Sequence, residues 1–168
     1  MYETCADHSP LWNRRSQIFE LALHSSDRLD VTPALQQPAL LWTCRQIRQE
    51  ARAVWYASST FHFTIQDCDD SLLCAFTKHV QDLEIEHPHT RVRLQGDQNW
   101  SNLVEWCHNV WHTRSIGVNK KDGQGAFSAI VAAAHEIAYR HDHASWAMCK
   151  AAWDNLEFVV RTLNSSWI

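Results

Sequence analysis

The segment Pro38–Tyr56 constrains the fold more strongly than any other part of the chain. Pro38 suits the first turn of a helix, where its missing N–H costs nothing. At about 100° per residue, the apolar side chains that follow fall within one arc of a helical surface. They are Leu40, Cys44, Ile47, Ala51, Val54 and Trp55. We therefore predict a helix at about residues 36–57, with this arc buried against the first helix and the next strand.

That next strand is Phe61–Ile65, in which apolar and polar residues alternate as in a half-buried strand. Similar patterns predict three more helices at about residues 11–24, 70–79 and 98–113. They also predict short strands at about residues 29–31, 80–86 and 91–94. The last 43 residues contain neither Gly nor Pro. Their apolar stripe changes phase near Arg140–Ser145, which predicts two helices with Asp142 as the cap of the second.

Two core predictions follow from these patterns and from the nine Trp residues of the chain. In the first helix we expect an inward-facing set made of Leu11, Trp12, Ile18, Phe19, Ala22 and Leu23. Among the tryptophans, periodicity assigns five to the core: Trp42, Trp55, Trp106, Trp111 and Trp153. Because an indole needs a partner for its N–H, we expect some of the tryptophans to lie at the rim of the core.

The central segment also carries a family resemblance. Residues 40–63 read LLxTCRQIRxEAxxxxY…TFxF, which resembles LLxTCRQIxxEAxxxFYxxNxFxF, the core of a large group of fungal F-box-like domains. Upstream, Asn13-Arg14 and Ile18–Leu23 are similar to the opening of that group, LPxELRNxIYELAL. The resemblance covers roughly residues 9–112 and implies a fold with no assigned chemistry.

One departure from the group's pattern bears on partners. Ser9-Pro10 stands where the group has Leu-Pro, and the expected Glu is missing. In an F-box, the leading Leu-Pro segment is part of what contacts the ubiquitin-ligase adaptor. We therefore expect weak or absent binding to that adaptor.

Together these patterns predict an α+β fold: a mostly helical single domain, residues 1–168, with a small sheet of short strands. Residues 1–112 would form the F-box-like region with its N-terminal helices, and residues 123–168 a C-terminal helical extension with a pair of helices. Hydrophobic residues make up 45% of the chain and charged residues 20%, which excludes wholesale disorder.

Net charge, hydropathy and the cysteine pattern limit the classes of partner and the location that we expect. The net charge is −4 and no long basic run occurs, so we expect no nucleic-acid footprint. No apolar run reaches the length of a membrane span, and the first residues lack a basic and apolar leader, so we expect no membrane and a cytoplasmic or nuclear location. The six Cys residues are scattered without a C-x-x-C pair, which favours free thiols.

A stripe of three arginines is the first candidate site. Arg45, Arg48 and Arg52 are spaced i, i+3, i+7 beside the apolar arc. They either lay their stems on the core and pair with neighbouring acids, or contact an anion or an acidic partner. The first interpretation is favoured, since charge rows on helices usually form a solvated or structural face.

The second candidate is the string Glu105, His108 and His112, which share one face of the predicted helix at 98–113. A carboxylate with two imidazoles is a feasible half-site for zinc or iron. Another Glu-x-x-His string ends at His87 on a predicted strand, where it cannot converge in the same way. The alternative is an outer polar face with ordinary surface histidines, and we predict no cofactor and no tightly held metal.

Two function classes remain. No nucleophile elbow, Gly-rich phosphate loop or H-E-x-x-H string occurs, so nothing favours catalysis, although a scattered catalytic set stays open. The first class is a non-catalytic protein–protein interaction module of the F-box-like type, as a substrate receptor or scaffold with an unknown partner. The alternative is a small ligand- or metal-dependent protein, or an enzyme, that uses the His- and Trp-rich C-terminal half. An exposed apolar patch favours the first, and an enclosed pocket with convergent polar groups the second.

Overall fold

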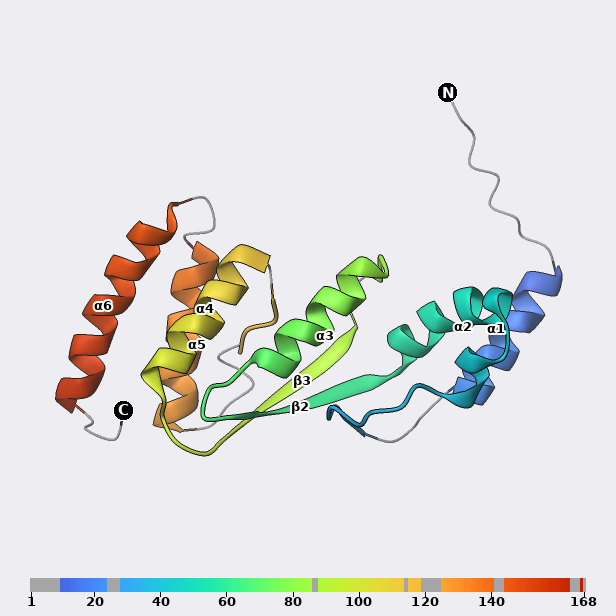
Figure 1. The fold of residues 1–168 in the computed structure, drawn as a ribbon, viewed down its shortest axis with the longest axis horizontal. Coiled ribbons are helices and arrows are strands. Elements are labelled where there is room, and N and C mark those ends of the chain that lie inside the picture. Colours follow the sequence, from blue (N-terminus) through green and yellow to red (C-terminus); the bar gives the residue numbers. More distant parts are fainter. Residues whose placement is uncertain are drawn as a thin grey trace, which may run out of the picture.

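The structure is a computed structural model that describes residues 10–23, 28–85, 88–113, 115–118, 125–140, 144–163 and 167 (Figure 1). In chain order these residues form α1 (Pro10–Leu23), β1 (Leu29–Asp30), the 3₁₀ helix η1 (Ala39–Trp42), α2 (Arg45–Ser58), β2 (Thr60–Gln66), α3 (Ser71–Asp82), β3 (His89–Gln95), α4 (Trp100–Thr113), α5 (Ala126–Arg140) and α6 (Trp146–Leu163). The predicted fold class, a mostly helical α+β domain with a small sheet, is confirmed.

The elements are arranged along one long direction (Figure 1). Helices α1 and α2 lie at one end, the strands with α3 lie in the middle, and α4, α5 and α6 form the other end. None of the described helices is both long and apolar enough to cross a membrane.

The sheet is parallel, with the strand order β1-β2-β3. Leu29 of β1 is paired with Phe61 of β2, and Phe61 in turn with Thr90 of β3. Along β2 the side chains alternate, so that Phe61, Phe63 and Ile65 are buried while the residues between them lie on the opposite, more exposed face. Both faces are usually covered in parallel sheets, and here the aromatic face is covered at β2 and partly covered at β3.

The core has two aromatic centres. In the first, Phe76 of α3 packs on Phe61 and Phe63 with ring centroids 5.0 and 5.1 Å apart, and Trp55 of α2 meets Phe61 edge-on at 5.4 Å. In the second, two buried indoles from α4 and α6 both find acceptors for their N–H groups. Trp106 donates to the carbonyl of Ile116, and Trp153 to that of Ala134, each at 3.0 Å.

The helix predicted at 36–57 is interrupted, which corrects the first expectation. Thr43 donates both its backbone N–H and its hydroxyl to the carbonyl of Leu40, which closes η1 as a short 3₁₀ turn. Cys44 is then extended, with φ −145° and ψ 167°, and α2 begins at Arg45. The break turns Cys44 to the surface and leaves Trp42 68% exposed, although both were expected in the core. Beyond the break, Ala51 and Trp55 are buried as predicted and Ile47 is half-buried.

The strand predicted at 80–86 is also wrong. Val80 to Asp82 complete the last turn of α3, and Glu84 adopts a left-handed conformation with φ 55° as the chain turns away. Val80 and Leu83 are spaced i, i+3, a separation that suits a helix as well as an irregular strand. The strand expected at 91–94 does occur, as the longer β3.

Two further expectations concern the C-terminal half. The predicted break between two helices is confirmed, because α5 ends at Arg140 and α6 begins at Trp146. The predicted cap, Asp142, lies outside the described residues, as do Ser9 and the side chains of Leu11 and Trp12.

Trp167 is buried against Trp100 and Phe127, with ring centroids 5.5 Å away in each case, so the end of the chain also belongs to the second aromatic centre.

Replacing Phe63 should be far more damaging than replacing an exposed phenylalanine. Phe63 is 1% exposed on the central strand, so Phe63→Ala should lower the free energy of unfolding by about 3–5 kcal/mol. Phe158→Ala is the matched control, because Phe158 is 74% exposed and its loss should change stability by less than about 0.5 kcal/mol. Urea denaturation of both variants measures the difference, and equal losses would contradict the placement of β2 at the centre of the core.

Candidate functional site

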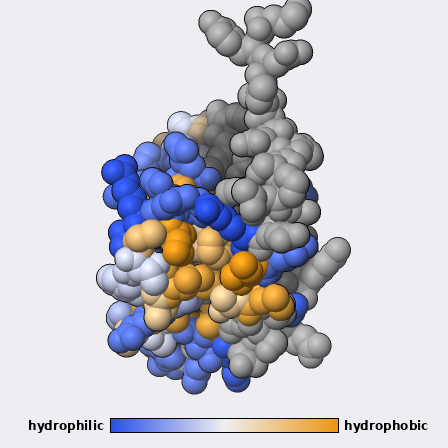
Figure 2. All heavy atoms as spheres, turned by 90° about the vertical axis from the view of Figure 1, so that its right-hand side faces the viewer, coloured by the Kyte–Doolittle hydropathy of each residue, from blue (hydrophilic) through white to orange (hydrophobic). Residues whose placement is uncertain are grey.

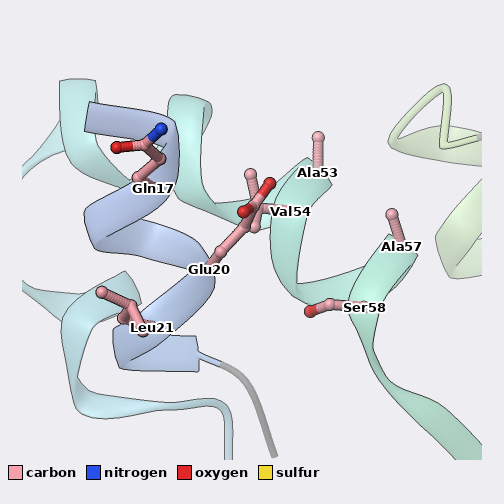
Figure 3. Close-up of a pocket in the computed structure, with 7 residues that line it drawn as sticks. All are labelled: Gln17, Glu20, Leu21, Ala53, Val54, Ala57 and Ser58. Carbon is pink, nitrogen blue, oxygen red and sulfur yellow. The ribbon is translucent and has the colours of Figure 1, made fainter. Parts of the chain in front are cut away.

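An open groove of about 960 Å³ lies between α1 and α2 (Figure 3). Seven residues line it: Gln17, Glu20 and Leu21 from α1, and Ala53, Val54, Ala57 and Ser58 from α2. Figure 3 shows Glu20 extending from α1 toward Val54 of α2, with the small side chains of Ala53 and Ala57 along the α2 wall. The groove is therefore largely apolar, and Glu20 is the one ionisable residue among its described lining residues.

The groove exists because α1 has apolar residues on more than one face. Phe19 and Leu23, spaced i, i+4, are buried. Ile18 and Leu21 are instead 60% and 83% exposed, and Ala22 is exposed too. The expectation that Ile18 and Ala22 point inward is therefore wrong, because a helix packed on one neighbour can bury only one arc of its surface.

On α2 the same division holds. Ala51 and Trp55 face the core, while Ala53 and Ala57 are exposed on the groove side. Figure 2 shows apolar side chains gathered into a patch on this end of the molecule. Single exposed apolar residues are common on proteins, but a contiguous patch marks an interaction surface.

The patch is bordered by an ion pair that ties the two helices together. Arg15 Nη1 of α1 lies 3.7 Å from Glu50 Oε1 of α2, and Gln46 donates to the same carboxylate at 2.9 Å. Glu20, by contrast, is exposed and forms no ion pair with any described residue. Among the described residues, a carboxylate without an ion pair thus lies in a mostly apolar groove.

The sequence did not identify this groove. Arg45, Arg48 and Arg52, the predicted contact stripe, do not line it. Arg48 donates from Nε to the carbonyl of Leu41 at 2.8 Å and so fastens η1 to α2, while Arg45 is exposed. Arg52 is half-buried near Tyr56. Burial raises the pKa of Tyr56, and the positive charge of Arg52 reduces that rise. A signal for the groove was present in the Ile18–Leu23 run, which is too apolar to be buried on a single face.

A second cavity, of about 430 Å³, lies between α3 and α4 and is polar. Its most buried carboxylate is Asp70, only 4% exposed, which accepts hydrogen bonds from Asn109 Nδ2 at 3.1 Å to each oxygen. Burial raises the pKa of Asp70 to about 6, and the negative charge of Glu105 adds to the rise. Burial and the charge of Asp70 also raise the pKa of the Cys74 thiol in the same cavity, so this thiol stays protonated and is a poor nucleophile.

The predicted metal trio is divided between two environments. Glu105 lines the polar cavity, whereas His108 and His112 stack on each other with ring centroids 5.8 Å apart. His108 also meets the edge of Trp146 from α6 at 4.3 Å, so its ring takes part in helix packing. Within the described ranges, no three His, Cys, Asp or Glu side chains form a group that could hold a metal ion.

One further histidine was not singled out from the sequence. His135 is fully buried on the inner face of α5, where its Nδ1 accepts the N–H of Val118 at 3.1 Å and its ring meets Trp106 at 4.4 Å. Burial lowers its pKa to about 3, so the ring is neutral and attaches the segment 115–118 to α5. Its position between the buried Val131 and Ala138 was the available signal.

Comparisons with known proteins returned no matching family model, no matching curated protein and no matching solved structure. The resemblance of residues 40–63 to fungal F-box-like domains therefore stays a prediction.

Replacing Asp70 by Asn should change how stability depends on pH. Because the folded pKa of Asp70, about 6, exceeds its ordinary value of 3.8, the folded chain holds an extra proton between these values. The contribution of Asp70 to the free energy of unfolding is complete below about pH 4 and is lost as the pH rises through 6. Asp70→Asn keeps an acceptor for Asn109 and does not titrate, so it should gain about 1–2 kcal/mol on the wild type between pH 4 and 7, a value reduced for solvent screening.

Urea denaturation at several pH values between 4 and 7 measures this difference. His135 gives the opposite pH dependence of stability. Because its pKa is lower in the folded state, the free energy of unfolding decreases as the pH falls below about 6.5. That trend is common to both proteins and cancels in their difference. Asp154→Asn on α6 controls for the loss of one negative charge. A constant difference between Asp70→Asn and wild type across the range would show that Asp70 is not the buried acid described.

Proposed function

We propose that this chain is a non-catalytic protein–protein interaction module of the F-box-like type, acting as a substrate receptor or scaffold. The observation that carries the proposal is the apolar groove between α1 and α2, with Leu21 83% exposed beside it. The protonated thiols of Cys68, Cys74 and Cys107, all with raised pKa values, support a role without a thiol nucleophile.

The groove suits a helix from the partner protein. It lies between two helices of 14 residues each, which are about 21 Å long. A helix satisfies its own backbone hydrogen bonds and can lay an apolar face in such a groove, with contacts at i, i+3, i+4 and i+7. The alanines of the α2 wall allow a helix backbone to approach closely.

The charge of Glu20 selects the kind of helix. An occupant that covers the groove takes this carboxylate out of water, and an unpaired buried charge is costly. A lysine or arginine on the occupant would neutralise it in a charge-assisted hydrogen bond. We therefore propose a partner helix with an apolar face and a basic residue opposite Glu20.

A second copy of this chain is a less suitable occupant. Its α6 also exposes apolar residues, among them Phe158 and Leu163. The cations on α6 are already paired within the helix, Lys150 with Asp154 and Arg161 with Glu157, at 3.0 and 2.8 Å. Docking α6 in the groove would thus bury Glu20 without offering it an unpaired cation.

The alternative function, a ligand- or metal-dependent protein, has one observation in its favour. The polar cavity between α3 and α4 brings Asp70 and Glu105 within reach of one small cationic ligand. Thermal-shift measurements with divalent cations and small amines test it. A stabilisation that Asp70→Asn removes would place this alternative ahead of the interaction module.

Replacing Leu21 should weaken the binding of a basic amphipathic helix. The probe is a labelled peptide of about 14 residues with a leucine face and lysines beside it. Leu21→Gln removes apolar contact area and should weaken binding about tenfold, because burying a leucine side chain is worth roughly 1.5–3 kcal/mol. Fluorescence anisotropy measures the affinity, and Phe158→Gln on α6 is the matched control, with no change expected.

Both substitutions lie at exposed positions and should leave the melting temperature nearly unchanged. Glu20→Lys should reverse the preference, so that a helix with glutamates in place of lysines binds better. Equal binding by wild type, Leu21→Gln and Phe158→Gln would count against the groove. If the chain self-associates and both glutamine variants dissociate it, the occupant is a second copy.

A further inference from the structure

The outer edge of β3 is an unpaired strand edge. β3 is the last strand in the order β1-β2-β3 and pairs with β2 along all seven of its residues. In the part of the chain that the structure describes, no backbone hydrogen bond outside this ladder reaches residues 89–94. Every second N–H and C=O of β3 therefore points away from the sheet, as in any edge strand.

The two faces of this edge differ in a regular way. On the core side, Val92 and Leu94 are only half-buried, whereas Phe63 and Ile65, their neighbours on β2, are each 1% exposed. The apolar row of the sheet thus continues onto the last strand, where it is only partly covered.

On the outer side, Arg91 and Arg93 are exposed and point the same way as their β2 neighbours His62 and Thr64. Neither arginine forms an ion pair with a described residue. Burial lowers the pKa of His62, the charge of Arg28 lowers it further, the charge of Asp30 opposes this shift, and the charge of Arg91 adds to it.

We propose that β3 is a docking edge for an extended segment of a partner protein in which acidic residues alternate with apolar ones. This surface is separate from the groove between α1 and α2 and does not depend on the function proposed for it. Adding such a segment would extend the sheet by a fourth strand.

The alternation of the proposed segment follows from that of β3. Side chains two residues apart on a strand are about 7 Å apart and point to the same face. Acidic residues at every second position would meet Arg91 and Arg93 across the strand pair, where opposite charges stabilise pairing and a guanidinium fork matches a carboxylate. The apolar residues between them would cover Val92 and Leu94, and the backbone would supply the hydrogen bonds that this edge lacks.

Other occupants fit this edge less well. A second copy of β3 would set arginine opposite arginine, and like charges on an edge are a common protection against self-pairing. Nucleic acid would meet two arginines that form no ion pair with a described residue, on a chain of net charge −4, and it has no backbone to continue the ladder. Of these three occupants, only the acidic strand offers both negative charge to Arg91 and Arg93 and a backbone that continues the ladder of β3.

The test uses the full chain and labelled peptides of about nine residues, the length of an ordinary strand. The first peptide alternates Glu with Val, and the second has the same composition with the Glu residues in one block. A third repeats the alternating sequence with N-methyl groups on every second amide, which removes the hydrogen bonds to β3. We expect the alternating peptide to bind, and the other two to bind at least about tenfold more weakly.

A charge-reversal variant supplies the second arm. Arg91→Glu with Arg93→Glu should lose at least about tenfold in affinity for the Glu–Val peptide and gain binding to a Lys–Val peptide of the same pattern. Arg45→Glu with Arg140→Glu changes the net charge equally at two exposed helical positions and should leave binding unchanged. The peptide comparison on the unaltered chain stands even if the double variant fails to fold.

Three outcomes would overturn the proposal. Equal binding of the N-methylated and unmodified peptides would mean attraction of charge without strand pairing. Equal binding of the block peptide would mean that alternation is irrelevant. Binding of a short single-stranded RNA at least as tightly as the Glu–Val peptide, lost in the same double variant, would mean that the arginines form a nucleic-acid site.

Discussion

The packing of one aromatic row on β2 holds α2, β2 and α3 together. Phe61 and Phe63 contact Phe76 of α3, and Trp55 of α2 meets Phe61 edge-on. These rings come from α2, β2 and α3, which follow one another along the chain. Their packing fixes how α2 is oriented against β2 and which side of α3 faces the sheet. With Trp55 inward, Ala53 and Ala57 must face outward, and this produces the α2 wall of the groove. The same row continues to Val92 and Leu94, where it ends half-covered at the edge of the sheet.

The sequence predicted those elements whose periodicity is long or unmistakable. The alternation in β2, the second half of α2 and the break between α5 and α6 were all predicted correctly, because each rests on several consecutive side chains that agree. The prediction failed where local hydrogen bonds compete with periodicity. Thr43 satisfies the carbonyl of Leu40 with its own hydroxyl and ends η1, which no hydrophobic pattern reveals. The Val80–Leu83 spacing was compatible with two structures, and the continuation of α3 decided between them.

The candidate sites show a related limit of sequence reasoning. Spacing on a helix tells which side chains share a face, but not what that face meets. Arg48 turned out to bind a carbonyl of its own chain seven residues earlier, and His108 packs on Trp146, which belongs to a helix much later in the sequence. The groove was missed for the opposite reason. An excess of apolar residues on α1 was visible, but only the packing of Phe19 and Leu23 on α2 determines that Ile18 and Leu21 are the ones left outside.

The two proposed surfaces have opposite charge, and this difference makes them selective. In the described part of the chain, the groove is apolar with one carboxylate, Glu20, that forms no ion pair, so it disfavours an acidic helix. The β3 edge instead places two guanidinium groups without ion pairs beside an apolar row, so it disfavours a basic strand. An occupant suited to one surface is therefore repelled by the other. A partner that engages both must present a basic helix and an acidic strand in separate segments, and linking the two would raise the local concentration of the second once the first is bound. Two surfaces of opposite charge would let the proposed scaffold or receptor distinguish its partner from other proteins.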